Sequence, residues 1–413
     1  MKQFITLSLL LLVLASKAST KRILFIGNSY TYVNNLPQLL YNLALSAGDT
    51  IVYDSNTPGG YTLQSHCTNA TTLSKISLGN WDYVILQEQS QNPAFSPQQV
   101  ASDVLPYAKR LDSLIHISNN CCQTVFYMTW GRINGDASNC AFYPPICTYL
   151  GMQQRLHESY LLMANNNNAV VSPVGEAWKN VRALYPNINL YSSDGSHPSI
   201  EGSYLAACVF YTSIFKTSCV GLTFTSTVSP SNALVLQQIG SETVLDSIDY
   251  WNTNIYYPQA TFSYNINNNV VTFQSQNNNA LSYVWNFGDG NIGQGESISH
   301  TYNQAGLYQI THTTSNNCFS NSFIQQVNFD APTSNKSIEV SSNKIWLNQI
   351  NKCIELKNDN ELMPLQYRIM DVGGHIIKKE LISINRIDIS QLPVGFYLLS
   401  INSKTYKFAL TTP

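Results

Sequence analysis

The chain has 413 residues, of which 44% are hydrophobic and 11% are charged, and its formal net charge is −2. This length exceeds one ordinary domain, so we expect two or three. The charged residues form no long basic run, which excludes a surface for nucleic acid. A low charged fraction with many Asn, Ser, Thr, Gln and Tyr residues is typical of a secreted protein.

The first residues have the pattern of a secretory signal peptide. Lys2 is positively charged, residues 5–14 form an apolar core, and Ser16-Lys17-Ala18 places small residues before a cleavage site. This core is shorter than a membrane-spanning helix, and no later apolar run approaches about 18 residues. We therefore expect residues 1–19 to be a signal peptide, the protein to be secreted or attached to the cell surface, and no transmembrane segment.

Strands and helices alternate through the first half of the chain. Short apolar runs predict strands, and positions repeating every three to four residues predict helices. The expected strands are 23–26, 50–53, 81–86, 124–129 and 169–174; the expected helices are 36–47, one near 61, 97–117, 152–164, 199–215 and a closing segment at 232–250. Strands that are apolar throughout indicate a parallel sheet covered on both faces. The sequence predicts a three-layer α/β/α domain at residues 20–255.

The second half of the chain has no helical period. Short alternating runs at 260–264, 270–274, 282–286 and 308–313 are separated by Asn- and Gly-rich turns. This pattern predicts a small all-β sandwich at residues 258–330. A polar linker, Ala331–Lys336, precedes a second β-rich module at residues 337–413.

Nine cysteines in an exported chain predict disulfides with at least one thiol left over. Cys140 and Cys147 bracket a short proline-containing loop, and we expect them to pair. Cys121 and its neighbour Cys122 are not expected to bond to each other, while Cys208 and Cys219 either pair or lie in the core. No spacing predicts a metal site, and we expect no cofactor.

A sharp turn follows the first strand. Gly27-Asn28-Ser29 separates the apolar run from a helical pattern, which places Ser29 beside a helix N-terminus at the carboxyl edge of the sheet. Free backbone N–H groups at such a place can stabilise the oxyanion of an acyl-transfer reaction. The alternative is a turn in which Asn28 or Ser29 only caps the helix.

Asp194 and His197 lie in one loop before the last helix of this domain. An Asp three residues before a His can orient the imidazole and leave its other nitrogen for a serine. Because such loops converge on the carboxyl edge of a parallel sheet, catalysis with Ser29 is favoured over a simple turn and cap.

Oxyanion donors are expected at the ends of neighbouring strands. Gly59 and Gly60 follow the second strand, where a glycine lets a backbone N–H approach a ligand. Gln87 and Gln89 follow the third strand, and a side-chain amide there can donate to the same oxygen.

These residues resemble the SGNH/GDSL hydrolases over about residues 20–251. The resemblance is closest to a bacterial branch with four blocks, which here are Gly27–Thr31, Gly59–His66, Leu86–Ser90 and Asp194–Ser199. The resemblance implies a flavodoxin-like sheet and a serine esterase. It makes Ser29 the nucleophile, His197 the general base and Asp194 its orienting carboxylate.

The same resemblance assigns the oxyanion site. The backbone N–H groups of Ser29 and Gly60 are two expected donors. The third block departs from the wider family, with Gln-Glu-Gln-Ser in place of Gly-x-Asn-Asp. Gln87 is the expected third donor, with Gln89 second. His66 in the second block is expected to be structural or at the substrate edge, and Trp130 and Glu88 either line the site or pack.

The two tail modules resemble known domains. Trp285–Gly290, His300–Tyr302 and Gly306–Tyr308 look like a PKD domain, an immunoglobulin-like sandwich in which Trp285 is expected to lie in the core. Residues 370–374 and 387–397, with a lysine in the last strand, are similar to the C-terminal sorting domain of type IX secretion. That similarity implies the secretion machinery as a partner.

Three functions are compatible with these features. The first is a secreted esterase that removes acyl groups, above all acetyl groups, from carbohydrate. The second is a carbohydrate-binding or adhesive surface protein whose hydrolase domain no longer turns over. The third is a lipase or thioesterase of the same fold.

Overall fold

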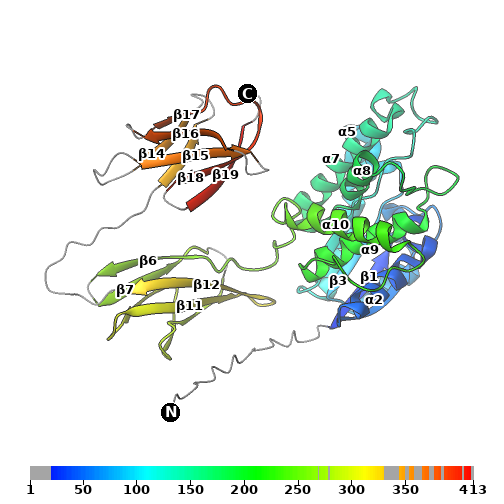
Figure 1. Ribbon diagram of the computed structural model, residues 1–413. Coiled ribbons are helices and arrows are strands. Elements are labelled where there is room, and N and C mark those ends of the chain that lie inside the picture. Colours follow the sequence, from blue (N-terminus) through cyan, green and yellow to red (C-terminus); the bar gives the residue numbers. More distant parts are fainter. Residues whose placement is uncertain are drawn as a thin grey trace, which may run out of the picture. The chain divides into compact units, whose positions relative to one another are not determined.

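A five-stranded parallel sheet organises the N-terminal domain (Figure 1). The computed structural model describes residues 20–267, 269–277, 280–329, 344–348, 353–357, 365–371, 376–382, 386–401 and 404–410. The strands are β1 (Thr20–Ile26), β2 (Thr50–Asn56), β3 (Tyr83–Leu86), β4 (Gln123–Tyr127) and β5 (Val170–Ser172). Their order, β2-β1-β3-β4-β5, confirms the flavodoxin-like topology. In such a sheet the order reverses between β1 and β3, where ligands bind at the carboxyl ends of the strands.

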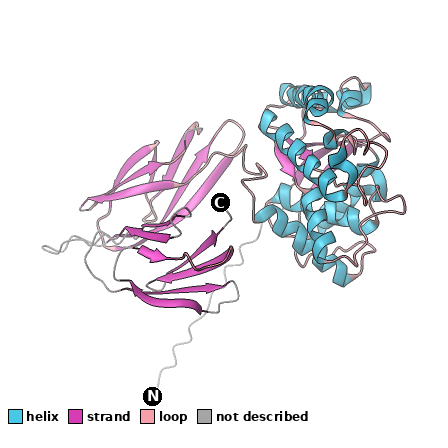
Figure 2. Ribbon diagram, turned by 90° about the horizontal axis from the view of Figure 1, so that it is seen from above, coloured by secondary structure: helices cyan, strands magenta, loops and turns pink. Residues whose placement is uncertain are grey.

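Helices cover both faces of this sheet, as Figure 2 shows. The helices are α1 (Ser29–Tyr32), α2 (Leu36–Ser46), α3 (Leu63–His66), α4 (Ala70–Ser77), α5 (Pro97–Asp103), α6 (Leu105–Ser118), α7 (Tyr149–Asn167), α8 (Val174–Leu184), α9 (Ile200–Phe215) and α10 (Pro230–Leu245). Two separate apolar cores result. One contains residues of α2, α8, α9 and α10, and the other contains residues of α3 to α7.

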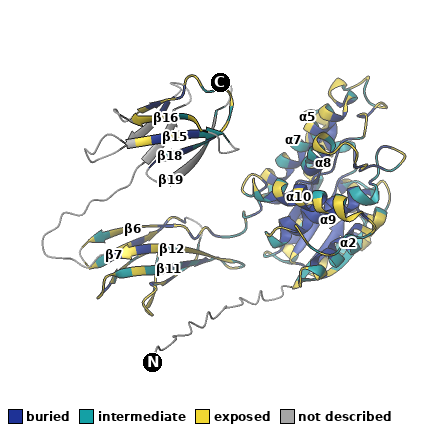
Figure 3. Ribbon diagram, viewed as in Figure 1, coloured by how far each residue is buried: buried dark blue, intermediate teal, exposed yellow. Residues whose placement is uncertain are grey.

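The central strands carry apolar residues at successive positions because both of their faces are buried, as in the second half of β1 and in β3. In β1, Ile23 and Phe25 belong to one core, whereas Leu24 and Ile26 belong to the other. Successive side chains of a strand point to opposite faces, so a sheet between two layers of helices needs no polar face. Figure 3 shows the middle of the sheet as buried.

Two helical segments differ from the sequence prediction. The helix expected at 97–117 is divided into α5 and α6 at Val104, because Pro106 cannot supply an N–H in the interior of a continuous helix. Helix α8 was not predicted. Its first residues follow Pro173, and the expected strand 169–174 included Val174, which instead begins the helix.

Two all-β modules follow. The first has a three-stranded and a four-stranded sheet, in the orders β10-β7-β6 and β12-β11-β8-β9. Its strands are β6 (Phe262–Asn267), β7 (Val270–Ser275), β8 (Ser282–Asn286), β9 (Ile292–Gln294), β10 (Ser297–Thr301), β11 (Gly306–Ser315) and β12 (Ser320–Phe329). Trp285 is fully buried between the sheets, as expected, and its indole N–H donates to the Gly295 carbonyl.

The second module begins beyond residue 331, where the chain divides into two compact units. Its sheets have the orders β13-β14-β17 and β16-β15-β18-β19. Its strands are β13 (Lys344–Asn348), β14 (Cys353–Lys357), β15 (Leu365–Asp371), β16 (Ile376–Ile382), β17 (Arg386–Asp388), β18 (Gly395–Ile401) and β19 (Lys404–Leu410). The predicted signal peptide, the linker Ala331–Lys336 and Gly373-Gly374 lie outside the described residues.

Two disulfides are formed. Cys140–Cys147 confirms the predicted pair, and Cys121–Cys318 joins the segment before β4 to the turn between β11 and β12. Cys67, Cys122, Cys208 and Cys219 are free and buried, so Cys208 and Cys219 lie in the core and do not pair. In the part of the chain that the structure describes, no helix is long and apolar enough to cross a membrane.

Candidate active site

The turn after β1 presents Ser29 at the carboxyl edge of the sheet. Asn28 is the N-cap of α1, and its Oδ1 accepts a hydrogen bond from the Tyr30 N–H at 3.2 Å. Gly27 has no room for a side chain, since a Cβ there would lie 2.6 Å from Gln87 Oε1 and 2.8 Å from Thr31 Oγ1. Asn28 thus caps the helix, as one interpretation expected, and the next residue, Ser29, remains free for chemistry.

The side-chain amide of Gln87 holds this turn through hydrogen bonds. It is fully buried, and its Oε1 accepts from the Asn28 N–H and the Thr31 hydroxyl, both at 2.9 Å. Its Nε2 donates to Asn28 Oδ1 at 2.8 Å and to the Glu88 carbonyl at 2.6 Å. Both amide hydrogens therefore already have acceptors within the protein. This geometry does not fit the expected role of Gln87 as an oxyanion donor, and it indicates that Gln87 supports the turn.

His66 supports the same turn from α3. Its ring is fully buried, its Nε2–H donates to the Gly27 carbonyl at 2.9 Å, and its Nδ1 accepts from the Thr72 hydroxyl at 2.8 Å. Burial lowers the pKa of His66, against the opposing effect of the bond to Gly27, and so favours the neutral ring. Of the two roles expected for His66, this geometry fits the structural one.

The structure brings Asp194 and His197 to Ser29. The Ser29 hydroxyl and His197 Nε2 lie 2.8 Å apart, and His197 Nδ1 lies 2.5 Å from Asp194 Oδ2. The other oxygen of Asp194 accepts the backbone N–H groups of Ser196 and His197, each at 2.9 Å. The carboxylate therefore fixes the tautomer in which Nε2 can accept the serine proton.

This histidine loop is open to solvent. The side chains of His197 and Asp194 are 36% and 48% exposed. Slight burial would raise the pKa of Asp194, but the hydrogen bonds from His197 and from the backbone hold it below its usual value. Asp194 thus stays charged at neutral pH.

Stacked aromatic rings lie beneath the loop. Trp178, Trp130 and Tyr30 stack in that order, with ring centroids 3.8 and 4.7 Å apart, and Tyr30 meets the His197 ring edge-on at 5.5 Å. The Trp130 indole N–H donates to the Ser196 carbonyl at 3.0 Å. Trp130 is fully buried, so it packs against the loop and does not line the substrate site.

The second block lies beside the serine turn. Asn28 Nδ2 donates to the Tyr61 carbonyl at 2.9 Å, next to Gly60. The Tyr61 N–H donates to the Pro58 carbonyl at 3.3 Å, and Gly60 has a positive φ of 72°, which together make a tight turn that favours glycine. Asn28 therefore fixes this turn relative to Ser29.

Gln89, at the end of the third block, is the other side-chain amide that the sequence offered as an oxyanion donor. Gln89 is partly buried, and its Nε2 donates to Gln91 Oε1 at 3.2 Å, which leaves its second amide hydrogen for a ligand. Its neighbour Glu88 is fully buried and accepts hydrogen bonds from the Leu63 and Gln89 N–H groups. Burial raises the pKa of Glu88 to about 7.

Sequence reasoning missed one charged residue at this edge. Arg132 lies five residues after the end of β4, and the neighbouring Ile133 N–H donates to the Gly195 carbonyl of the histidine loop at 2.8 Å. A single Arg after a strand carries no spacing signal. Only the position of β4 beside β3 in the sheet could have indicated it.

Family models match the two tail modules. Residues 258–336 match the PKD domain, and residues 344–410 match the secretion system C-terminal sorting domain. Among curated proteins, none matches this chain.

Solved structures resemble the N-terminal domain. A protein of Slackia heliotrinireducens, assigned provisionally as an SGNH hydrolase, is 30% identical over 46% of this chain and 97% of its own, with a TM-score of 0.38. A DUF4886 family protein of Bacteroides uniformis is 18% identical over 55% of this chain and 95% of its own, with a TM-score of 0.48. The esterase EstA of a Pseudoalteromonas species is 13% identical over 48% and 97%, with a TM-score of 0.36.

Proposed function

Because the N-terminal domain belongs to the SGNH hydrolase family and the chain carries a sorting domain for type IX secretion, we propose that this secreted hydrolase is a serine esterase. The observation that carries the proposal is the chain of contacts from Ser29 through His197 to Asp194, at 2.8 and 2.5 Å. These distances are those of a nucleophile, a general base and an orienting carboxylate.

The proposed reaction has two steps. Ser29 Oγ attacks the ester carbonyl while His197 Nε2 takes its proton, and the alcohol leaves with that proton, so that an acyl-Ser29 intermediate remains. Water then attacks the acyl group, again with His197 as base, and the acid and the free serine are released. Asp194 orients His197 and stabilises its positive charge in both steps.

The proposed oxyanion site uses backbone donors. The Ser29 N–H at the start of α1 and the Gly60 N–H in its turn are the first two, because Asn28 links the two segments. Gln89 is the proposed third donor, since its amide keeps a hydrogen that Gln87 does not.

For the substrate, we propose acyl groups on carbohydrate, with acetyl the simplest. An open site with exposed Asp194 and His197 side chains suits a bulky polar alcohol. Secretion and the adjoining PKD domain are compatible with a polysaccharide outside the cell.

Hydrolysis of p-nitrophenyl acetate by the full chain tests this function. We expect turnover in the wild type and a loss of about 10³-fold or more in Ser29→Ala, with the melting temperature unchanged. Activity that survives Ser29→Ala contradicts the proposal. If the wild type hydrolyses neither this ester nor acetylated oligosaccharides but binds the glycan, the result favours the adhesive alternative.

A further inference from the structure

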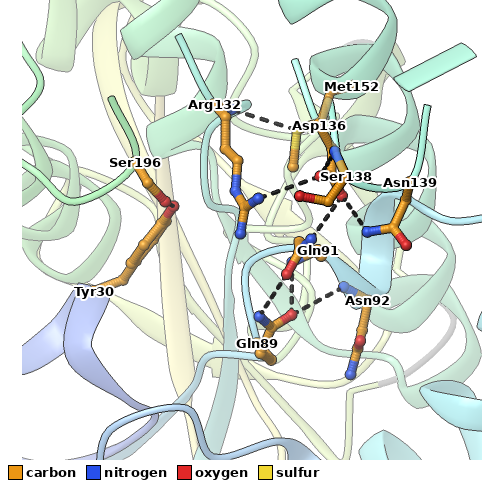
Figure 4. A network of polar contacts seen from close by, with 10 residues as sticks. All are labelled: Tyr30, Gln89, Gln91, Asn92, Arg132, Asp136, Ser138, Asn139, Met152 and Ser196. Atoms are coloured by element: carbon orange, nitrogen blue, oxygen red, sulfur yellow. Dashed lines mark hydrogen bonds and ion pairs between the residues drawn. The ribbon is translucent and has the colours of Figure 1, made fainter. Parts of the chain in front are cut away.

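A buried carboxylate organises the loops after β3 and β4 (Figure 4). Asp136 is fully buried, and its Oδ1 accepts from Arg132 Nη1 and the Ser138 N–H, both at 3.2 Å. Its Oδ2 accepts from Gln91 Nε2 at 2.6 Å and from Asn139 Nδ2 at 2.8 Å. Asp136 therefore holds a guanidinium in one place while neutral donors satisfy the rest of its oxygens.

The pair stays ionised. Burial would raise the pKa of Asp136, but the hydrogen bonds from Gln91 and Asn139 and the charge of Arg132 hold it below its usual value. The Cys140–Cys147 disulfide closes the same loop, and the Asp136 N–H donates to the Ile146 carbonyl within it at 2.8 Å. Arg132 is thus oriented by a fixed anion on a cross-linked loop.

Some N–H groups of the Arg132 guanidinium are not hydrogen-bonded to the protein. Asp136 engages Nη1, whereas Nη2 makes no hydrogen bond among the described residues and is not among the buried atoms. The side chain is 27% exposed, so the guanidinium also reaches solvent. An oriented arginine with unused N–H groups at a ligand site is suited to a planar anion such as a carboxylate.

Arg132 lies on a loop that contacts the histidine loop. Burial raises the pKa of Tyr30, and the positive charge of Arg132 opposes this rise; the Tyr30 hydroxyl contacts Ser196 Oγ of the histidine loop at 2.7 Å. In the view of Figure 4, the guanidinium lies between the Tyr30–Ser196 pair and the Gln89–Gln91 pair. The backbone next to Arg132 contacts that loop as well, through Ile133.

The position indicates which part of the ester Arg132 would meet. His197 returns its proton to the departing alcohol, so the alcohol part lies on the histidine side of Ser29. The Gly60 turn follows β2 on one side of β1, whereas Arg132 follows β4 on the other side. The loop after β4 contacts the histidine loop, where the Ile133 N–H donates to the Gly195 carbonyl at 2.8 Å, so Arg132 lies on the side of the alcohol.

We propose that Arg132 binds a carboxylate on the alcohol part of the substrate, so that the preferred substrates are acyl esters of hydroxy acids, such as acylated acidic sugars. The inference rests on the proposed esterase function and names the substrate class of the same site. Arg132 is a binding residue here, and Asp136 positions it.

Matched small esters test the inference with the full chain. The substrates are 3- and 4-acetoxybenzoate, whose alcohol parts carry a carboxylate, and their methyl esters, which are neutral. We compare the wild type with Arg132→Gln, Arg132→Lys and the charge control Lys179→Gln, a residue of α8 that pairs with Glu176. Comparing enzymes on one substrate cancels the different intrinsic reactivities of the esters.

In Arg132→Gln, we expect kcat/KM for at least one acetoxybenzoate to fall about tenfold or more, the size of a lost charge-assisted hydrogen bond, with the methyl esters changed less than about twofold. Arg132→Lys should retain part of the preference, and Lys179→Gln should match the wild type. An equal fall in kcat/KM on both kinds of ester, or no fall on either, overturns the inference but does not contradict the proposed esterase function. Absence of Ser29-dependent hydrolysis of all four esters overturns both.

Discussion

The two halves of the candidate site are held in opposite ways. The serine turn is fixed by buried side chains, in which Gln87, Asn28 and His66 satisfy one another and the backbone. The histidine loop is exposed, and backbone N–H groups and stacked aromatic rings hold it. Changes in the buried side chains that hold the serine turn should therefore affect folding and rate together, while changes in the histidine loop should affect rate alone.

The largest effect is expected from Asp194→Asn. The new amide can still accept the two backbone N–H bonds, but its Nδ2 would face His197 Nδ1 and favour the tautomer with a proton on Nε2. We expect kcat for p-nitrophenyl acetate to fall about 10³-fold or more. Because the side chain is exposed, the free energy of unfolding should change by less than about 0.5 kcal/mol. A folded variant with near-normal kcat would refute the assigned role of Asp194.

Gln87→Leu tests the buried half. It leaves the Asn28 N–H and the buried Thr31 hydroxyl without the oxygen that accepts from them, at about 1–3 kcal/mol for each buried group. We expect a loss of about 3 kcal/mol or more in urea unfolding, with kcat reduced as well. An oxyanion donor would behave differently, with a fall of about 10²–10³-fold in kcat at unchanged stability. That second result would restore Gln87 to the oxyanion site.

Ionisation of Glu88, which lies among the buried side chains near the serine turn, should make the free energy of unfolding depend on pH. Its pKa of about 7 in the folded protein exceeds the ordinary value of 4.5, so the folded state binds the proton more tightly than the unfolded chain. Stability should therefore fall as pH rises from 4.5 to 7, by about 3 kcal/mol at about 1.4 kcal/mol per pKa unit, and then level off.

Urea unfolding of the wild type and Glu88→Gln at pH 5 and pH 8 measures this slope. The difference between the two proteins should change with pH, since the amide that replaces the Glu88 carboxyl group cannot titrate. A constant difference across this range would mean that Glu88 keeps an ordinary pKa.

The smallest effect is expected from the disulfide near the histidine side. Cys140→Ser/Cys147→Ser opens a loop with a sequence separation of 7, and chain entropy predicts a loss of about 2 kcal/mol. The folded variant should keep its rate on a neutral ester, because the contacts that join Ser29, His197 and Asp194 involve no residue of this loop. Equal unfolding midpoints in urea would show that the bond adds no stability.

Much of the site followed from sequence because its residues lie in local patterns. Ser29 follows an apolar strand, and the spacing of Asp194 and His197 allows a contact within one loop. The parallel sheet between two layers of helices followed from the alternation of strands and helices, and its flavodoxin-like order from the resemblance.

Other features depend on contacts that no local pattern shows. Gln87 and Gln89 both follow β3, but only the folded chain shows that Gln87 points beneath the serine turn. Arg132 gains its place from Asp136 and from the β4 position in the sheet. Cys121 and Cys318 are 197 residues apart, so nothing in their spacing predicts the bond.

The most direct test of the central claim is covalent labelling of the nucleophile. The full chain is incubated with a p-nitrophenyl phosphonate ester, which transfers its phosphonyl group to an activated serine, and the modified peptide is identified by mass spectrometry. The account predicts one label, on Ser29, which is absent from Ser29→Ala and strongly slowed in His197→Ala. A label on another residue, or equal labelling of Ser29→Ala, would contradict it.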